Sequence, residues 1–115
     1  MEFEYGSVKV ERLFKDLNKM KRKIGDKLTK AVKKRCDQLK AAETFADFLS
    51  LRLGKPHSLS EDKKGCYGIY VTGNIRLVVA PISEDLSPES LKVCRKIIVK
   101  GVEDYHGSKT RTFIP

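Results

Sequence analysis

The sequence predicts an α+β domain in which an N-terminal helical hairpin packs on an antiparallel β-sheet. Two observations carry this prediction. Apolar residues recur every three or four positions over the first half of the chain, as in amphipathic helices, and in short, densely apolar runs from residue 66 onward, as in strands. The length of 115 residues suits one domain, and helices that precede strands in this order favour the α+β class.

The first half supplies the hairpin. A short strand is expected over residues 2–5, and Ser7 is expected to be the N-cap of a helix that ends at Gly25. The apolar stripe of this helix comprises Val10, Leu13, Phe14, Leu17, Met20 and Ile24. Asp26 is expected to cap a second helix with the same apolar spacing, and a third, short helix is expected to begin after Thr44.

The second half supplies the sheet. Residues 66–72 and 75–81 predict a hairpin joined by a Gly-Asn pair, which suits a two-residue type II′ turn. That turn places Val71 opposite Arg76. Both faces of the hairpin are mostly apolar, so we expect it to lie in the middle of the sheet and to be covered at least partly on both sides.

The remaining segments follow from composition. Residues 83–90 are polar and predict a loop, and residues 91–105 resume the strand pattern, with Gly101 as the position of a bulge or bend. No apolar periodicity marks residues 107–115. The sequence therefore predicts one domain over residues 1–106 and a C-terminal tail over residues 107–115.

The charge is strongly positive and unevenly distributed. The chain has 24 Lys and Arg residues against 15 Asp and Glu residues, and residues 9–55 alone hold 15 basic and 6 acidic side chains, a net charge of +9. A basic face of this density favours a polyanion such as nucleic acid, an acidic protein or a membrane surface. A solvated helix surface that keeps a small protein in solution explains the same charge equally well.

Several classes of protein are excluded. No apolar run approaches the roughly 18 residues of a membrane span, and no secretory signal is expected. The sequence has no P-loop, GxGxxG, HExxH, GxSxG or CxxC pattern, so we expect no metal and no cofactor. Cys36, Cys66 and Cys94 are expected to be small buried residues in a reducing compartment, which favours the cytoplasm.

Two positions are candidates for chemistry. Arg76 interrupts an apolar strand, and a buried guanidinium needs either a carboxylate such as Asp62 or Asp104 or a phosphate group. The structural ion pair and the phosphate clamp are both left open. Residues 103–106 end the last strand with an Asp, a Tyr and a His, which suit proton transfer, although a polar strand terminus explains them as well.

Three segments, in order, resemble HigB-type toxins of the RelE/ParE superfamily. HSLSEDKKGCYGI, from His57 to Ile69, resembles the family stretch H-x-L-x-G-D-x-x-G-x-x-S-I. GNIRL, around Arg76, resembles the strand N-x-R-I/L, and EDYH at residues 103–106 resembles the C-terminal D-Y-H. Order and spacing agree from about residue 50 to residue 106, whereas the helical hairpin agrees in pattern rather than in identities.

The resemblance implies a RelE/ParE-like fold with a curved antiparallel sheet and a toxin of a type II toxin–antitoxin pair. Such toxins enter the ribosomal A site, cut mRNA and inhibit translation in the cytoplasm. The implied partners are the ribosome with its mRNA and a helix-turn-helix antitoxin of HigA type. Operator DNA is an indirect partner through the antitoxin complex.

Position by position, the resemblance implies catalytic roles for His57, Arg76, Asp104, Tyr105 and His106. The implied reaction is attack of a ribose 2′-OH on the adjacent phosphate. Arg76 stabilises the phosphate, while His106 and Tyr105 handle protons or stack on a base. The implied mechanism depends on the expectation that Arg76 and His106 both contact the same phosphodiester. RNA is expected to contact Lys63, Lys64, Lys30, Lys33 and Lys34.

The chain departs from the family pattern at four places, one of which is Ile75, where the family often has an aromatic residue before the arginine. In addition, Ser60 stands where the family often has lysine, Glu61 replaces a glycine, and the chain continues beyond His106. Two alternatives therefore accompany the ribonuclease: a non-catalytic toxin relative that binds its antitoxin and RNA, and a gyrase poison of the ParE branch. The EDYH ending argues against a gyrase poison, which has no evident need for an acid/base cluster.

Overall fold

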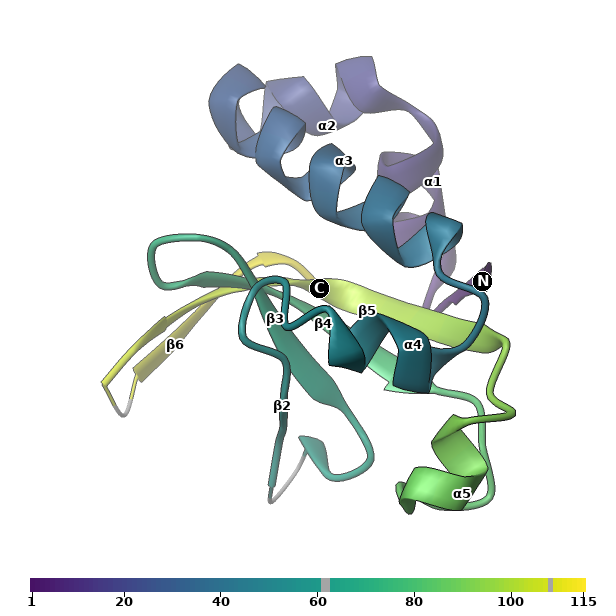
Figure 1. Ribbon diagram of the computed structural model, residues 1–115. Coiled ribbons are helices and arrows are strands. Elements are labelled where there is room, and N and C mark those ends of the chain that lie inside the picture. The colour runs from purple at the N-terminus through teal and green to yellow at the C-terminus, as the bar shows by residue number, and fades with distance from the viewer. Residues whose placement is uncertain (61–62, 108) are drawn as a thin grey trace.

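A computed structural model describes residues 1–60, 63–107 and 109–115. These residues form an α+β fold in which three helices cover one side of a twisted sheet and two shorter helices lie near one end of it (Figure 1). The helices are α1 (Val8–Lys15), α2 (Leu17–Ile24), α3 (Asp26–Ala41), α4 (Phe45–Ser50) and α5 (Pro88–Leu91). The strands are β1 (Glu2–Tyr5), β2 (His57–Ser58), β3 (Tyr67–Thr72), β4 (Ile75–Pro81), β5 (Lys96–His106) and β6 (Lys109–Ile114).

The sheet is mixed, which corrects the expectation of an antiparallel sheet. Within the described residues its strand order is β1-β5-β4-β3-β2, and β6 also pairs with β5. The pairs β2–β3, β3–β4, β4–β5 and β5–β6 are antiparallel, but β1 runs parallel to β5 with Phe3 opposite Ile97. Parallel neighbours need a long connection, and the helices and the central hairpin provide it here.

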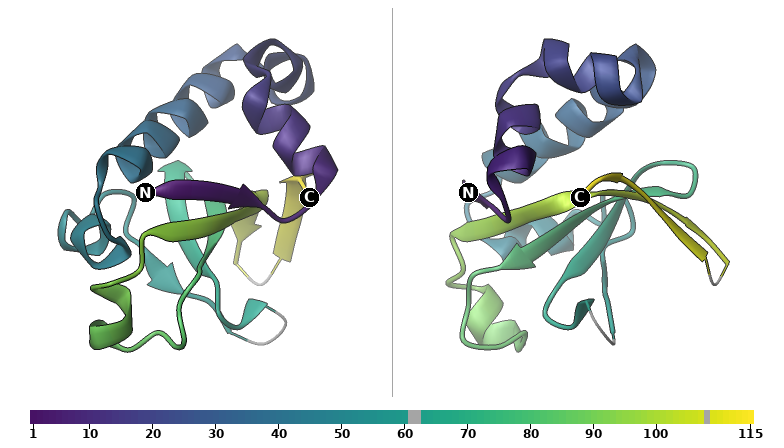
Figure 2. Two further views of the ribbon diagram at one scale, coloured as in Figure 1. Left: turned by 90° about the vertical axis from the view of Figure 1, so that its right-hand side faces the viewer. Right: turned by 180° about the vertical axis from the view of Figure 1, so that it is seen from behind.

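Residues 109–114 form a strand of the sheet, so the expectation of a tail does not hold for this part of the segment. β6 pairs with the second half of β5, from Ile114 opposite Val102 to Lys109 opposite His106. β1 occupies the first half of the same edge of β5 (Figure 2). Ile114 is 1% exposed and belongs to the core. The C-terminal segment therefore closes an edge that β1 leaves open.

The N-terminal helical region is divided more finely than its apolar stripe indicates. Instead of one helix from residue 8 to residue 24, the chain breaks at Asp16, which ends α1 and begins α2. The Asp16 carboxylate accepts a hydrogen bond from the Lys19 backbone N–H at 3.1 Å and so caps α2. Ser7 caps α1 as expected, whereas Gly25, with φ of 90°, rather than Asp26 stands at the N-cap of α3.

The central β3–β4 hairpin has a different register from the predicted one. Tyr70, rather than Val71, lies opposite Arg76, and the register shifts between Tyr70 and Thr72. Val71 is therefore the extra residue of a bulge. The shift places Tyr70 on the same face as Arg76, where a regular two-residue turn would have placed Val71. A second irregularity, beside Gly101 in β5, is the bulge expected at that residue.

The core lies between α1–α3 and the side of the sheet that faces them. Its most buried residues come from both layers and include Val10, Met20, Val32, Leu39, Ile69, Leu77, Val79 and Val99. The three cysteines are free and buried, as expected. Burial raises the pKa of the Cys36 thiol to about 12. In the part of the chain that the structure describes, no helix has the length and apolarity of a membrane span.

Candidate functional site

Arg76 is the centre of a polar cluster on the sheet face that points away from α1–α3. Leu77 and Val79, its neighbours on the other face of β4, are buried in the core beneath those helices, so strand alternation turns Arg76 to the opposite side. The side chains of His57, Lys63, Glu103 and Tyr105 surround it. These five residues are called the Arg76 cluster below.

Glu103 is the anionic partner of Arg76. The two residues lie opposite each other on β4 and β5, and Arg76 Nε lies 3.3 Å from Glu103 Oε1. Lys63 Nζ lies 2.9 Å from Oε1 and 2.6 Å from Oε2 of the same carboxylate. Only 6% of the Arg76 side chain and 4% of the Glu103 side chain are exposed. A buried carboxylate thus balances two cations, and the structural ion pair left open in the sequence is formed by Glu103.

Neither of the two carboxylates considered from the sequence, Asp62 and Asp104, is seen as the partner of Arg76 in the described residues. Asp62 lies outside the described residues. Asp104 follows Glu103 along β5 and lies opposite Ile75, so it faces the helical side of the sheet. Its Oδ1 is buried and has no hydrogen-bond partner among the described residues. Asp104 is therefore separated from Arg76 by the sheet.

His57 contacts Arg76 from β2. Its Nδ1 lies 3.0 Å from the Lys55 carbonyl oxygen, and its Nε2 lies 3.3 Å from Arg76 Nη1. A carbonyl only accepts and a guanidinium only donates, so this network selects the neutral tautomer with the proton on Nδ1. The Nε2 lone pair consequently faces the guanidinium. The ring stacks on Tyr70 with centroids 5.5 Å apart, which fixes its plane.

Gly68 makes room for this contact. It lies opposite His57 in the β2–β3 pair and adjacent to Arg76. A Cβ atom at this position would lie 3.0 Å from Arg76 Cδ and 3.2 Å from His57 Nε2. The absence of a side chain therefore lets the imidazole approach the guanidinium across β3.

Tyr105 covers the outer side of the guanidinium. Its ring centroid lies 4.2 Å from Arg76 Cζ, a cation–π distance. Tyr105 lies two residues after Glu103, on the same face of β5, and 37% of it is exposed. One face of the Tyr105 ring lies against the Arg76 guanidinium. The opposite face of such an exposed ring is a surface on which a nucleobase can stack.

His106 does not join the Arg76 cluster. It follows Tyr105 along β5, so it faces the opposite side of the sheet. Its Nδ1 lies 3.0 Å from the side-chain nitrogen of Asn74 in the β3–β4 turn. The structure thus brings His57, Arg76 and Tyr105 together but separates Asp104 and His106 from them. The expected convergence of Arg76 and His106 on one phosphodiester is not formed.

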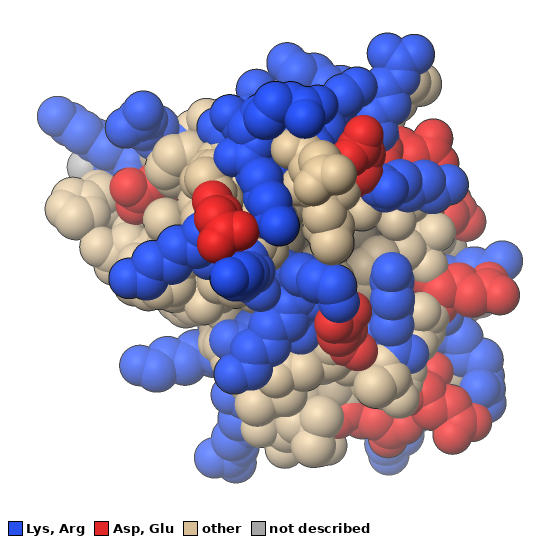
Figure 3. All heavy atoms as spheres, turned by 90° about the horizontal axis from the view of Figure 1, so that it is seen from above, with Lys and Arg blue, Asp and Glu red and all other residues tan. Residues whose placement is uncertain are grey.

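The lysines proposed to bind RNA fall into two groups. Lys63 belongs to the Arg76 cluster, and Lys64 is exposed beside it. Lys30, Lys33 and Lys34 lie on α3, in the helical layer on the other side of the sheet. Figure 3 shows that face, on which Lys and Arg side chains cover much of the surface. Lys30 and Lys33 form exposed ion pairs with Asp26 and Asp37.

Three residues that form or support the Arg76 cluster were not identified from the sequence: Glu103, which belongs to the cluster, and Tyr70 and Gly68, which contact it. Glu103 had a usable signal, because it lies two residues before Tyr105 and therefore shares its face of the strand. Tyr70 was assigned to the wrong face because the bulge at Val71 has no clear mark in the sequence. In the described residues, no group of three His, Cys, Asp or Glu side chains is arranged to hold a metal ion.

Comparisons of the chain with models of known protein families, with curated proteins and with solved structures found no match.

Proposed function

We propose that the chain is a cytoplasmic, RelE/ParE-like toxin of a type II toxin–antitoxin pair that binds mRNA on the ribosome and cleaves it at the Arg76 cluster. The observation that carries the proposal is the contact between an imidazole and a buried guanidinium: His57 Nε2 lies 3.3 Å from Arg76 Nη1. A proton acceptor beside a fixed cation is what phosphodiester cleavage by a ribose 2′-OH requires. Tyr105 adds an exposed ring over the same cation.

Each group has one role in the proposed reaction. When the RNA phosphate engages the Arg76 guanidinium, Arg76 Nη1 releases the Nε2 lone pair of His57, which accepts the proton of the 2′-OH as the 2′-oxygen attacks the adjacent phosphorus. Arg76 and Lys63 stabilise the negative charge of the pentacoordinate phosphorane. The bond from phosphorus to the 5′-oxygen breaks, and the Tyr105 hydroxyl donates a proton to that oxygen. The products are a 2′,3′-cyclic phosphate and a 5′-hydroxyl end.

The Arg76 cluster suits a single-stranded RNA that lies over the surface of the sheet rather than a small molecule in a deep pocket. The hollow beside Lys63 and Glu103 has a volume of about 150 Å³. Pockets for drug-sized ligands occupy roughly 300–1,000 Å³. An RNA strand that crosses the sheet would stack one base on Tyr105 and place one phosphate near Lys63. The basic helical layer would then contact ribosomal RNA through phosphates, and a HigA-type antitoxin would cover the toxin.

A second candidate function is an RNA- and antitoxin-binding protein without catalytic activity. The Glu103 carboxylate favours it, because Arg76 and Lys63 both point at a group that already carries negative charge. A phosphate must compete with this carboxylate for the two cations. In this alternative the cluster is a structural ion pair and Tyr105 is a stacking surface.

The test is incubation of the full-length protein with ribosomes programmed with a defined mRNA, followed by mapping of cut sites and end groups. The proposal predicts cuts in mRNA in the A site that leave a 2′,3′-cyclic phosphate and a 5′-hydroxyl. Uncut mRNA together with ribosome binding would select the non-catalytic alternative. Trapped DNA breaks with purified gyrase, and no effect on mRNA, would select the gyrase poison.

A further inference from the structure

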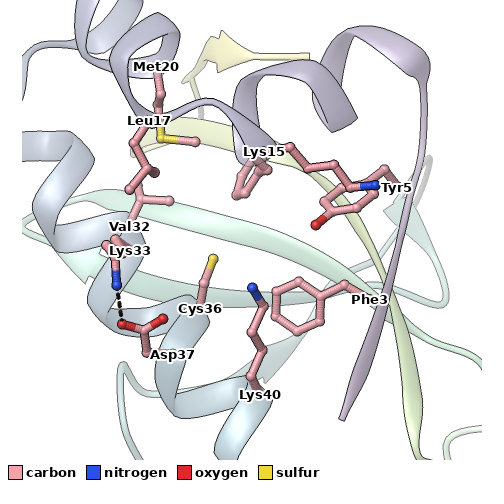
Figure 4. Close-up of a pocket in the computed structure, with 11 residues that line it drawn as sticks. Phe3, Tyr5, Lys15, Leu17, Met20, Val32, Lys33, Cys36, Asp37 and Lys40 are labelled. Carbon is pink, nitrogen blue, oxygen red and sulfur yellow. Dashed lines mark hydrogen bonds and ion pairs between the residues drawn. The ribbon is translucent and has the colours of Figure 1, made fainter.

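A second candidate site lies on the helical side of the sheet, away from the Arg76 cluster. Here β1 and helices α1–α3 line a cavity of about 570 Å³ that is open to solvent on one side and falls within the size range typical of small-molecule sites (Figure 4). Its wall combines apolar and aromatic residues, namely Phe3, Tyr5, Phe14, Leu17, Met20 and Val32, with the charged residues Lys15, Lys33, Asp37 and Lys40. A cavity with this mixed lining suits a ligand that has both an apolar part and a polar or charged end.

Two lysines at this cavity are held against its aromatic residues. Lys40 Nζ lies 5.1 Å from the ring centroid of Phe3, and Lys15 Nζ lies 5.8 Å from that of Tyr5. Both contacts fall within cation–π range, so aromatic side chains of the wall position the ammonium groups. Lys15 also pairs with Glu11, whereas no carboxylate of the described residues pairs with Lys40.

The other polar groups of the cavity add no uncompensated negative charge. Asp37 is neutralised by Lys33, whose Nζ lies 2.7 Å from it. Figure 4 shows the Tyr5 oxygen and the Cys36 sulfur pointing into the cavity. Burial raises the pKa of the Tyr5 phenol and that of the Cys36 thiol, so both groups are uncharged at neutral pH. The charge at the cavity is therefore positive, and its strongest unpaired donor is Lys40.

We propose that this cavity binds an alkyl carboxylate of the fatty-acid class. The alkyl chain lies against the aromatic and aliphatic wall, and the carboxylate lies beside Lys40, within reach of the Tyr5 hydroxyl. Charge complementarity selects this ligand. A cationic amphiphile would meet Lys40 with like charge, and a neutral one would leave the ammonium without an anionic partner. The site is independent of RNA cleavage at the Arg76 cluster.

The test is calorimetric titration of the full-length protein with sodium decanoate at pH 7.5, kept below the concentration at which decanoate aggregates. Decan-1-ol and decyltrimethylammonium are the matched neutral and cationic probes. We expect saturable 1:1 binding of decanoate, at least about tenfold weaker binding of the alcohol, and no binding of the cation. Absence of saturable binding, or equal binding of acid and alcohol, would overturn the proposal.

Two lysines of α3 give a matched pair of variants. Lys40→Ala removes the proposed partner of the carboxylate, whereas Lys34→Ala removes an exposed lysine of the same helix that does not line this cavity. We expect Lys40→Ala to weaken decanoate binding about tenfold and Lys34→Ala to leave it unchanged. Equal weakening by both variants would show non-specific attraction to the basic surface and would contradict the assigned site. Thermal unfolding of each variant verifies that the fold is retained.

Discussion

Glu103 and Arg76 lie opposite each other on β5 and β4, and their buried side chains form an ion pair that Lys63 completes from the other side of the carboxylate. This ion pair fixes the positions of the cationic side chains in the candidate site, and it also hinders the binding of a phosphate there. The carboxylate holds two cations in fixed positions, and it also occupies the place that a phosphate would take. The balance between these two effects determines whether the cluster acts on RNA.

The first prediction concerns the stability that this ion pair provides. Glu103→Gln keeps the shape of the side chain and one acceptor oxygen but leaves the buried Arg76 without an anion. We expect the free energy of unfolding to fall by about 1–3 kcal/mol. Urea denaturation measures the change, and Glu43→Gln, in an exposed pair with Arg95, is the control, with an expected loss of less than about 1 kcal/mol. Equal losses would mean that burial adds nothing to the Glu103 pair.

A second prediction concerns the space at Gly68. A methyl group there would lie 3.0 Å from Arg76 Cδ and 3.2 Å from His57 Nε2, so Gly68→Ala must push one of them away. We expect mRNA cleavage to fall about tenfold to a hundredfold. The ribosome assay measures the rate. Gly6→Ala is expected to retain full cleavage, because its tightest contact would be with the flexible Lys100 side chain at 3.2 Å and its other contacts would be at ordinary van der Waals distances. A fully active Gly68→Ala would show that close contact of His57 and Arg76 is unnecessary.

A third prediction follows from the raised pKa of Cys36. Burial raises this pKa from 9.0 to about 12 in the folded protein, so the unfolded chain loses its thiol proton first as pH rises. The contribution of Cys36 to stability is therefore complete below about pH 9 and is lost as the pH approaches about 12. The stability difference between wild type and Cys36→Ala should shrink between pH 7.5 and pH 10.5. Urea denaturation at the two pH values measures it, and a constant difference would contradict the assignment.

A fourth prediction tests whether β6 is part of the domain. Ile114 is buried in the core, so Ile114→Ala should lower the free energy of unfolding by about 2–5 kcal/mol. Thr110→Ala, at an exposed position of the same strand, should change it by less than about 0.5 kcal/mol. A negligible effect at Ile114 would return this segment to the status of a tail.

Much of the fold could be predicted because helices and hairpins are determined largely by residues that are close in the sequence. Ser7, Thr44 and the apolar stripes fix where helices begin and which faces they bury, and the hairpin follows from its Gly-Asn turn. Pairing between distant segments could not be predicted, because the sequence alone gives no register for β1 against β5 or for β6 against β5. A four-residue strand and a six-residue strand beside one long strand carry little signal of their own.

The candidate site could be predicted only in part, because residue types and their order are visible in the sequence but their arrangement on the sheet is not. His57, Arg76 and Tyr105 were identified by residue type and order, and they do lie together. Adjacent residues of a strand point to opposite faces, so Tyr105 and His106 cannot both meet Arg76 on an extended β5. The bulge at Val71 then decides which residue of β3 joins them, and it arises from backbone geometry that residue types do not reveal.

The most direct test of the account is to compare His57→Gln and His106→Gln in the programmed-ribosome assay. The two variants remove the same imidazole from opposite faces of one sheet. The account predicts that His57→Gln lowers the cleavage rate about 10²- to 10⁴-fold, as expected for loss of a general base, and that His106→Gln cleaves at close to the wild-type rate. Loss of cleavage in His106→Gln with full activity in His57→Gln would place the chemistry on the other face and contradict the account.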